Sequence, residues 1–64
     1  MRLLEFRLEK GYSQKELGDA VGLSYQAISH YEKGRRELPV SVAKKIGEVL
    51  EVDWWILYED ERNN

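Results

Sequence analysis

Apolar residues recur along this chain every three or four positions, and glycine or proline separates most of the segments that carry them. That spacing is typical of amphipathic helices rather than of strands, in which apolar and polar residues alternate. The pattern predicts helices over residues 2–10, 14–21, 25–33, 40–51 and 54–59. We therefore expect an all-α fold, one compact five-helix bundle over residues 1–59, followed by a polar tail at 60–64. No internal repeat, linker or low-complexity segment is apparent.

The same pattern predicts which residues are buried. The expected core positions are Leu3, Leu4, Phe6 and Leu8 in the first helix, Leu17, Ala20 and Val21 in the second, Ile28 and Tyr31 in the third, and Val42, Ile46, Val49 and Leu50 in the fourth. Gly18 and Gly47 lie inside helices, where glycine costs up to about 1 kcal/mol relative to alanine. We interpret them as positions where another helix approaches closely.

Polar residues mark the starts of the helices. Ser13 and Glu16 have the spacing of a capping box, in which the hydroxyl accepts from the Glu16 amide and the carboxylate reaches back. Ser24 and Asp53 are suitable N-cap residues for the third and fifth helices. Pro39 suits the first turn of the fourth helix.

Composition narrows the class of protein. Sixty-four residues allow one domain with a modest core. The chain has no cysteine and one histidine, so we expect no disulfide, no metal site and no cofactor. So short a chain has no room for a deep pocket, which argues against an enzyme and against a small-molecule ligand.

No apolar run approaches the roughly 20 residues of a membrane span, so we expect no membrane partner. Glu5 and Arg7 interrupt the first apolar residues, which is unlike a signal peptide, and we expect a cytoplasmic protein. Charge is unevenly distributed within the overall net charge of −2. Residues 1–45 hold nine Lys and Arg against six Asp and Glu, whereas residues 46–64 hold one against six. The basic part can face an anionic partner while the acidic end faces away.

The short segment Gly22-Leu23-Ser24 joins the second and third helices, with glycine first and an apolar residue second. Such a turn is typical of a helix-turn-helix, whose second helix enters the major groove of DNA. Other helical hairpins also contain turns of this kind.

From Arg7 to Leu57, about four-fifths of its length, the chain resembles the Cro/C1-type helix-turn-helix family, also called the XRE family. This family includes the lambdoid phage repressors and Cro proteins. The matching residues are Arg7, Gly11, Ser13-Gln14, Glu16-Leu17, Val21-Gly22, Ser24, Ile28-Ser29, Tyr31-Glu32, Gly34 and Ala43-Lys44-Lys45-Ile46. The resemblance implies a lambda-repressor-like bundle that binds double-stranded DNA, encoded by a prokaryote or a phage.

The resemblance assigns base contacts to Ser24, Tyr25, Gln26 and His30. Gln26 has the amide that can bond bidentately to adenine. Tyr25 is less usual at its position, and it can stack on a thymine methyl, bond a phosphate or cover Leu23. His30 fits a residue of the groove wall better than a pH switch or a metal ligand, because the chain has no second histidine and no cysteine.

Phosphate contacts are implied at Ser13, Gln14, Lys33, Arg35 and Arg36. Gln14 begins the second helix, where free N–H groups and the helix dipole favour an anion. It can also be an ordinary polar residue of the first turn. The three cations follow the third helix, in the loop that meets the DNA backbone in the family.

Arg7 and Glu32 match a buried ion pair that ties the first helix to the end of the third in this family. The alternative is two exposed charges, whose pairing contributes less than about 1 kcal/mol.

The final helix departs from the family pattern because residues 54–58 are apolar throughout, where the family alternates apolar and acidic residues. One helix of so small a domain cannot bury every side, and an exposed aromatic patch is typical of an interface. We therefore expect a homodimer that forms through Trp54, Trp55 and Tyr58, with Trp55 near its centre. Alternatively, Trp55 lies flat over the first or the fifth helix.

Together these features predict a sequence-specific transcriptional regulator, a repressor that binds a two-fold-related operator as a homodimer. Antitoxins and restriction-modification controllers use the same domain. A protein-interaction module that binds through its Trp-rich end is the remaining alternative.

Overall fold

The computed structural model describes residues 1–59, which contain four α-helices, one 3-10 helix and no strand. The helices are α1 (Leu3–Glu9), α2 (Gln14–Val21), α3 (Tyr25–Glu32), α4 (Val40–Leu50) and the 3-10 helix η1 (Trp54–Tyr58). The all-α prediction is therefore confirmed, whereas the last of the five expected α-helices is a 3-10 helix. The predicted polar tail at 60–64 lies outside the described residues.

η1 has the hydrogen-bond spacing of a 3-10 helix. The Ile56 N–H donates to the Asp53 carbonyl (3.1 Å), and the Glu59 N–H donates to the Ile56 carbonyl (3.2 Å). The backbone is extended at both Asp53 and Glu59, so only five residues can coil, a length at which 3-10 geometry is common. Asp53 is the N-cap residue of η1, as the sequence predicts, but its carboxylate makes no capping hydrogen bond.

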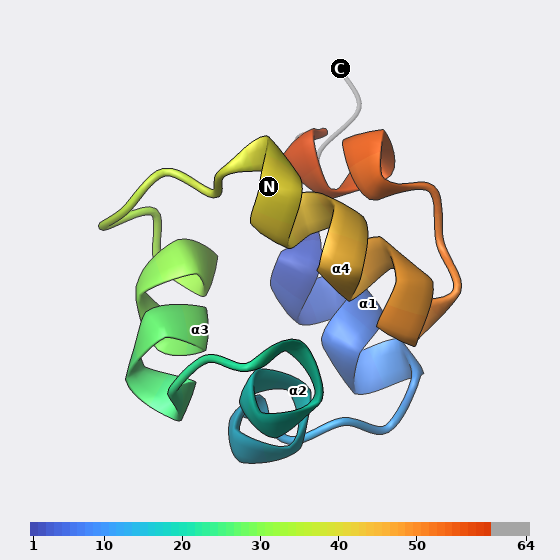
Figure 1. Ribbon diagram of the computed structural model, residues 1–64. Helices are drawn as coiled ribbons and strands as arrows, with labels where there is room; N and C mark the ends of the chain where they lie inside the picture. The colour runs from blue at the N-terminus through green and yellow to red at the C-terminus, as the bar shows by residue number, and fades with distance from the viewer. Residues whose placement is uncertain (60–64) are drawn as a thin grey trace.

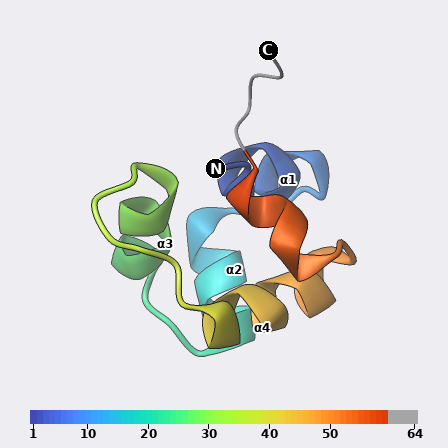
Figure 2. The same ribbon diagram turned by 90° about the horizontal axis from the view of Figure 1, so that it is seen from above.

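α2 packs against α3 and α4, whereas α1 packs against α3 and η1. Figure 1 looks across α4 with α1 behind it, and Figure 2 shows the same arrangement from above. Both views place α3 at the edge of the molecule, with no other helix on its outer side. This position leaves one face of α3 free for a partner.

The core lies where the five elements meet. Each element contributes at least one side chain with no exposed area, and the largest of these are Leu3, Leu17, Ile28, Ile46, Leu50 and Leu57. Among residues 1–59, every buried side-chain nitrogen and oxygen has a hydrogen-bond partner. No helix in this part of the chain has the length and hydropathy needed to cross a bilayer.

Three residues expected in the core are exposed. Leu4 and Leu8 expose 39% and 62% of their surface, and Ala20 is also exposed. α1 turns Leu3, Phe6 and a charged residue, Arg7, toward the core, so the next positions around the helix face solvent. The apolar pattern could not reveal that an arginine is buried.

Gly18 and Gly47 lie where the backbone that follows each helix folds back over it. A Cβ atom at Gly18 would stand 2.6 Å from the Leu23 carbonyl oxygen, and one at Gly47 would stand 2.8 Å from the Val52 carbonyl oxygen. The expected close approach is therefore present at both glycines. At Gly18 it is made by the turn that follows the helix, whereas at Gly47 the first residue of η1, Trp54, also lies within 3.1 Å of the added Cβ.

Pro39 precedes α4 as its N-cap instead of lying in its first turn. Its backbone is extended, with φ −66° and ψ 148°, and its carbonyl accepts the hydrogen bond from Ala43 N–H (2.9 Å). Proline is well suited to this position because its ring sets φ near this value.

Candidate nucleic-acid interface

α2 begins at the capping box that the sequence predicts. The Ser13 hydroxyl accepts from the Glu16 N–H (2.9 Å), and the Glu16 carboxylate accepts from the Ser13 N–H (2.9 Å). The pKa of Glu16 lies below its ordinary value, chiefly because the Ser13 backbone N–H donates to the carboxylate and, to a smaller extent, because of the Ser13 hydroxyl. The box sets where the N-terminus of α2 points, and Ser13 is exposed there.

The turn from α2 to α3 occupies three residues. Gly22 ends α2 with φ 77°, a left-handed conformation that glycine adopts without steric cost. Leu23 is half-buried against the core, and Ser24 caps α3 by accepting from the Ala27 N–H (3.2 Å). α3 consequently begins close to the end of α2, with its first turn at the surface.

α3 has a buried apolar side and an exposed side that is mostly polar. Ala27, Ile28 and Tyr31 are buried. Of the residues for which base contacts are predicted, Ser24 and Gln26 are exposed, Tyr25 exposes 52% of its surface and His30 is half-buried. These four residues therefore lie at or near the surface of one short helix, over slightly more than one and a half turns.

The residues for which phosphate contacts are predicted fall at two places. Ser13 and Gln14 lie at the start of α2, where N–H groups of the first turn point out of the helix. Lys33, Arg35 and Arg36 are exposed after the end of α3. Gln14 is half-buried, and its amide donates to a Glu32 carboxylate oxygen (2.9 Å). The sequence predicted a phosphate contact for Gln14 but did not reveal this hydrogen bond to Glu32.

Arg7 and Glu32 form an ion pair whose side chains are only 8% and 5% exposed. The guanidinium contacts the carboxylate through two nitrogens, and a third nitrogen donates to the Tyr12 carbonyl (2.8 Å). With the Gln14 amide on the same carboxylate, this network joins α1, the start of α2 and the end of α3. It therefore holds the two helices of the helix-turn-helix at a defined angle.

The aromatic end of the chain is partly exposed. Trp55 exposes 56% of its surface and Tyr58 39%, whereas Trp54 is half-buried. The ring centre of Trp54 lies 5.8 Å from that of Trp55 and 6.2 Å from that of Tyr58, and it meets each ring edge to face. The Tyr58 hydroxyl donates to the Leu38 carbonyl (2.6 Å), and burial raises the pKa of this phenol. η1 is thus tied to the segment that follows the basic loop, a link that the sequence did not indicate.

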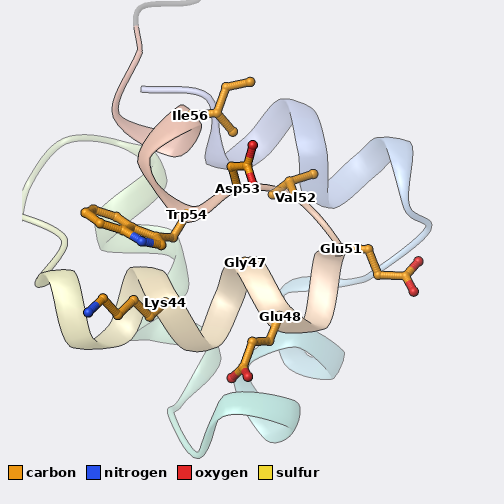
Figure 3. Close-up of a pocket in the computed structure, with 8 residues that line it drawn as sticks. All are labelled: Lys44, Gly47, Glu48, Glu51, Val52, Asp53, Trp54 and Ile56. Carbon is orange, nitrogen blue, oxygen red and sulfur yellow. The ribbon is translucent and has the colours of Figure 1, made fainter.

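A shallow pocket of about 530 Å³ lies between α4 and η1, and Figure 3 shows the residues that line it. The Lys44 ammonium lies 5.7 Å from the centre of a Trp54 ring, and the carboxylates of Glu48, Glu51 and Asp53 point away from one another. Within residues 1–59, no group of His, Cys, Asp or Glu side chains is placed to hold a metal ion.

A second cavity of about 590 Å³ lies beside η1, between the loop after α3 and the start of α4. Arg36, Leu38, Val40 and Tyr58 are among the residues that line it. The basic loop and the aromatic end are therefore neighbours.

The helix-turn-helix family model matches residues 3–54 of this chain. The "Uncharacterized HTH-type transcriptional regulator YqaF" of Bacillus subtilis (strain 168) is 44% identical over 57 residues, which are 89% of this chain and 75% of that protein. An uncharacterized HTH-type transcriptional regulator of Sinorhizobium medicae (strain WSM419) is 36% identical over 50 residues, 78% of this chain and 36% of that protein. The chain therefore corresponds to about a third of that relative. No solved structure gave a significant match.

The match covers α1, α2, α3 and α4, and so includes the turn between α2 and α3. Its coverage, with that of the Bacillus subtilis relative, shows that the chain belongs to the Cro/C1-type helix-turn-helix family.

Proposed function

We propose that this protein is a sequence-specific transcriptional regulator, a repressor that binds a two-fold-related DNA operator as a homodimer. The observation that carries the proposal is the exposed polar face of α3, which follows a tight turn at the edge of the molecule. A helix in this position can enter the major groove with its N-terminal residues toward the base edges. The names of the relatives, which describe transcriptional regulators, support it.

In this proposal, Ser24, Tyr25, Gln26 and His30 face the bases. The start of α2 and the basic loop after α3 contact the phosphates on either side, through Ser13, Gln14, Lys33, Arg35 and Arg36. Neutral side chains would then provide sequence discrimination, while the cations provide affinity that falls with salt.

The exposed aromatic end provides the contact between subunits. An indole can bury about 150–250 Å², and Trp55 exposes more than half of its surface in the single chain. A two-fold contact through Trp54, Trp55 and Tyr58 would hold two copies of α3 about 34–36 Å apart, one turn of DNA. Binding of such a dimer represses by occluding a promoter.

Selection of duplexes from a random pool tests the proposal with the whole chain. We expect enrichment of a two-fold-related sequence. Arg35→Ala or Arg36→Ala should weaken binding to all duplexes alike and lower the salt slope by about one for each phosphate that a subunit no longer neutralises. Lys45→Ala, at an exposed position of α4, is the control of equal charge. A pool with no enriched sequence contradicts sequence-specific binding.

Trp55→Glu tests the dimer. The variant should remain folded, because Trp55 is 56% exposed, but its binding to an operator with two half-sites should no longer be cooperative. Leu8→Glu, at a 62% exposed position of α1, is the matched control and should retain cooperativity. Cooperative binding by the Trp55 variant would place the subunit contact elsewhere. If the Trp55 variant keeps cooperative DNA binding and loses only the binding of a protein partner, the interaction-module alternative holds.

A further inference from the structure

The end of α3 that would read bases has no cationic side chain. Tyr25 and Gln26 are its most exposed residues, and no lysine or arginine occurs between Tyr25 and Glu32. The cations of this region, Lys33, Arg35 and Arg36, all follow the last residue of the helix. α3 is therefore neutral at its N-terminal end and basic beyond its C-terminal end.

The two glutamines of the helix-turn-helix are in different states. The Gln14 amide is half-buried and already donates to Glu32 (2.9 Å). The Gln26 amide is exposed and makes no hydrogen bond within residues 1–59. Of the two glutamines, only Gln26 therefore offers a free amide donor and a free amide acceptor at the surface of α3.

Major-groove chemistry matches this pair of free groups to adenine. Adenine presents an acceptor at N7 and a donor at N6, which a glutamine amide can bind together. Guanine presents two acceptors, N7 and O6, and is most often read by arginine or lysine, which α3 lacks. The exposed ring of Tyr25, one residue earlier, suits the apolar methyl group of thymine.

We propose that the first turn of α3 reads adjacent A·T pairs, with Gln26 on an adenine and Tyr25 against a thymine methyl, and that it makes no guanine contact. This inference rests on the proposed function and specifies the operator class that it would recognise. Base choice and charge are then separated along the chain, with base reading at the start of α3 and the cations in the loop that follows it.

The test begins with the sequences selected from a random duplex pool by the whole chain. The proposal expects adjacent A·T pairs in each half-site. Replacing the contacted adenine by 7-deazaadenine, which lacks the N7 acceptor, should weaken binding by about 5- to 150-fold, the range for one bidentate base contact. The same replacement should change little for Gln26→Ala, which has no amide to bind N7. Gln14→Ala is the matched control, and it should weaken binding to all sequences without altering base preference.

Tyr25 is tested with deoxyuridine in place of thymidine, which removes only the methyl group. We expect weaker binding by the parent chain and by Tyr25→Phe, and no effect for Tyr25→Ala. A weakening for Tyr25→Phe that is independent of the thymine methyl would assign the hydroxyl to a phosphate and overturn this half of the proposal.

Two outcomes distinguish the inference from the function beneath it. Selected half-sites with a fixed G·C pair whose preference disappears in Gln26→Ala would overturn A·T reading while leaving sequence-specific binding intact. A pool with no enrichment for any duplex would overturn the proposed function itself.

Discussion

The turn from α2 to α3 and the turn from α4 to η1 follow the same backbone course. In each, the chain folds back so that an N–H donates to a glycine carbonyl five residues earlier, Leu23 to Gly18 (2.8 Å) and Val52 to Gly47 (3.0 Å). In each, a Cβ atom on that glycine would collide with the returning backbone. The residue that ends the helix is left-handed in both turns, with φ 77° in the first and 60° in the second.

The two turns differ in how local chemistry supports them. The left-handed residue is Gly22 in the first turn and Glu51 in the second, the only non-glycine with positive φ in residues 1–59. Ser24 caps the helix after the first turn, whereas Asp53 at the equivalent position forms no side-chain cap. The first turn therefore has stronger local determinants.

The difference extends to what each turn presents. The first leads to an eight-residue α-helix with a polar outer face, whose end is held by the buried ion pair of Arg7 and Glu32. The second leads to a five-residue 3-10 helix with exposed aromatic rings, held by the Tyr58 hydroxyl on Leu38. One turn geometry can thus present either a candidate base-reading helix or a candidate subunit contact. The residues that follow it determine which.

The largest effect is expected at the buried ion pair of Arg7 and Glu32, which holds the helix after the first turn and has no counterpart at the second within residues 1–59. Glu32→Ala leaves the Arg7 guanidinium buried without its partner, which should lower the free energy of unfolding by about 3–5 kcal/mol, as measured by urea denaturation. Replacing both residues with apolar ones, Arg7→Met with Glu32→Leu, should recover much of the stability. The control Glu5→Ala breaks a more exposed pair with Arg2 and should cost less than about 1 kcal/mol. Equal destabilisation by Glu32→Ala and Glu5→Ala would contradict the role of burial.

The shared glycine tests whether the turns are equivalent. Gly18→Ala and Gly47→Ala should each destabilise by about 1–3 kcal/mol, because the added methyl meets a backbone oxygen that can move only with the turn. The effect should be larger at Gly18, where the distance is 2.6 Å, than at Gly47, where it is 2.8 Å. Ser41→Ala, exposed in α4, serves as the comparison and should not destabilise. Thermal unfolding of the three variants decides the order.

The caps should respond unequally. Ser24→Ala removes the acceptor for the Ala27 N–H and should cost about 1 kcal/mol. Asp53→Ala removes no capping hydrogen bond and should stay within about 0.5 kcal/mol of the parent chain. A larger destabilisation at Asp53 than at Ser24, in the same denaturation experiment, would reverse this difference between the turns.

Substitutions at the left-handed residue should have effects of similar size to those at the caps, but with opposite signs in the two turns. Gly22→Ala forces a Cβ into φ 77° and should destabilise by about 1 kcal/mol. Glu51→Gly relieves the same conformation but adds freedom to the unfolded chain, so the net gain should be about 0.5 kcal/mol. If the unfolding temperatures of Gly22→Ala and Glu51→Gly, measured by calorimetry, shift in the same direction, then the left-handed conformation does not determine the stability of these variants.

Several features followed from the sequence because they depend on neighbours in the chain. The capping box at Ser13, the cap at Ser24 and the end of α2 at Gly22 each involve residues within four positions. The pairing of Arg7 with Glu32 was implied by family resemblance rather than by local pattern, and the pair is present. The base and phosphate contacts remain predictions, because they depend on a DNA partner.

The sequence by itself determined the four α-helices, the tight turn before α3 and the polar outer face of that helix, since local hydrogen bonding and apolar spacing suffice for them. Only the tertiary structure decided that Leu4 and Leu8 face solvent, that Gln14 shares a carboxylate with Arg7 and that Tyr58 binds the Leu38 carbonyl. The physical reason is distance along the chain: these last two contacts join residues 18 and 20 positions apart, and they form only when the whole bundle has packed.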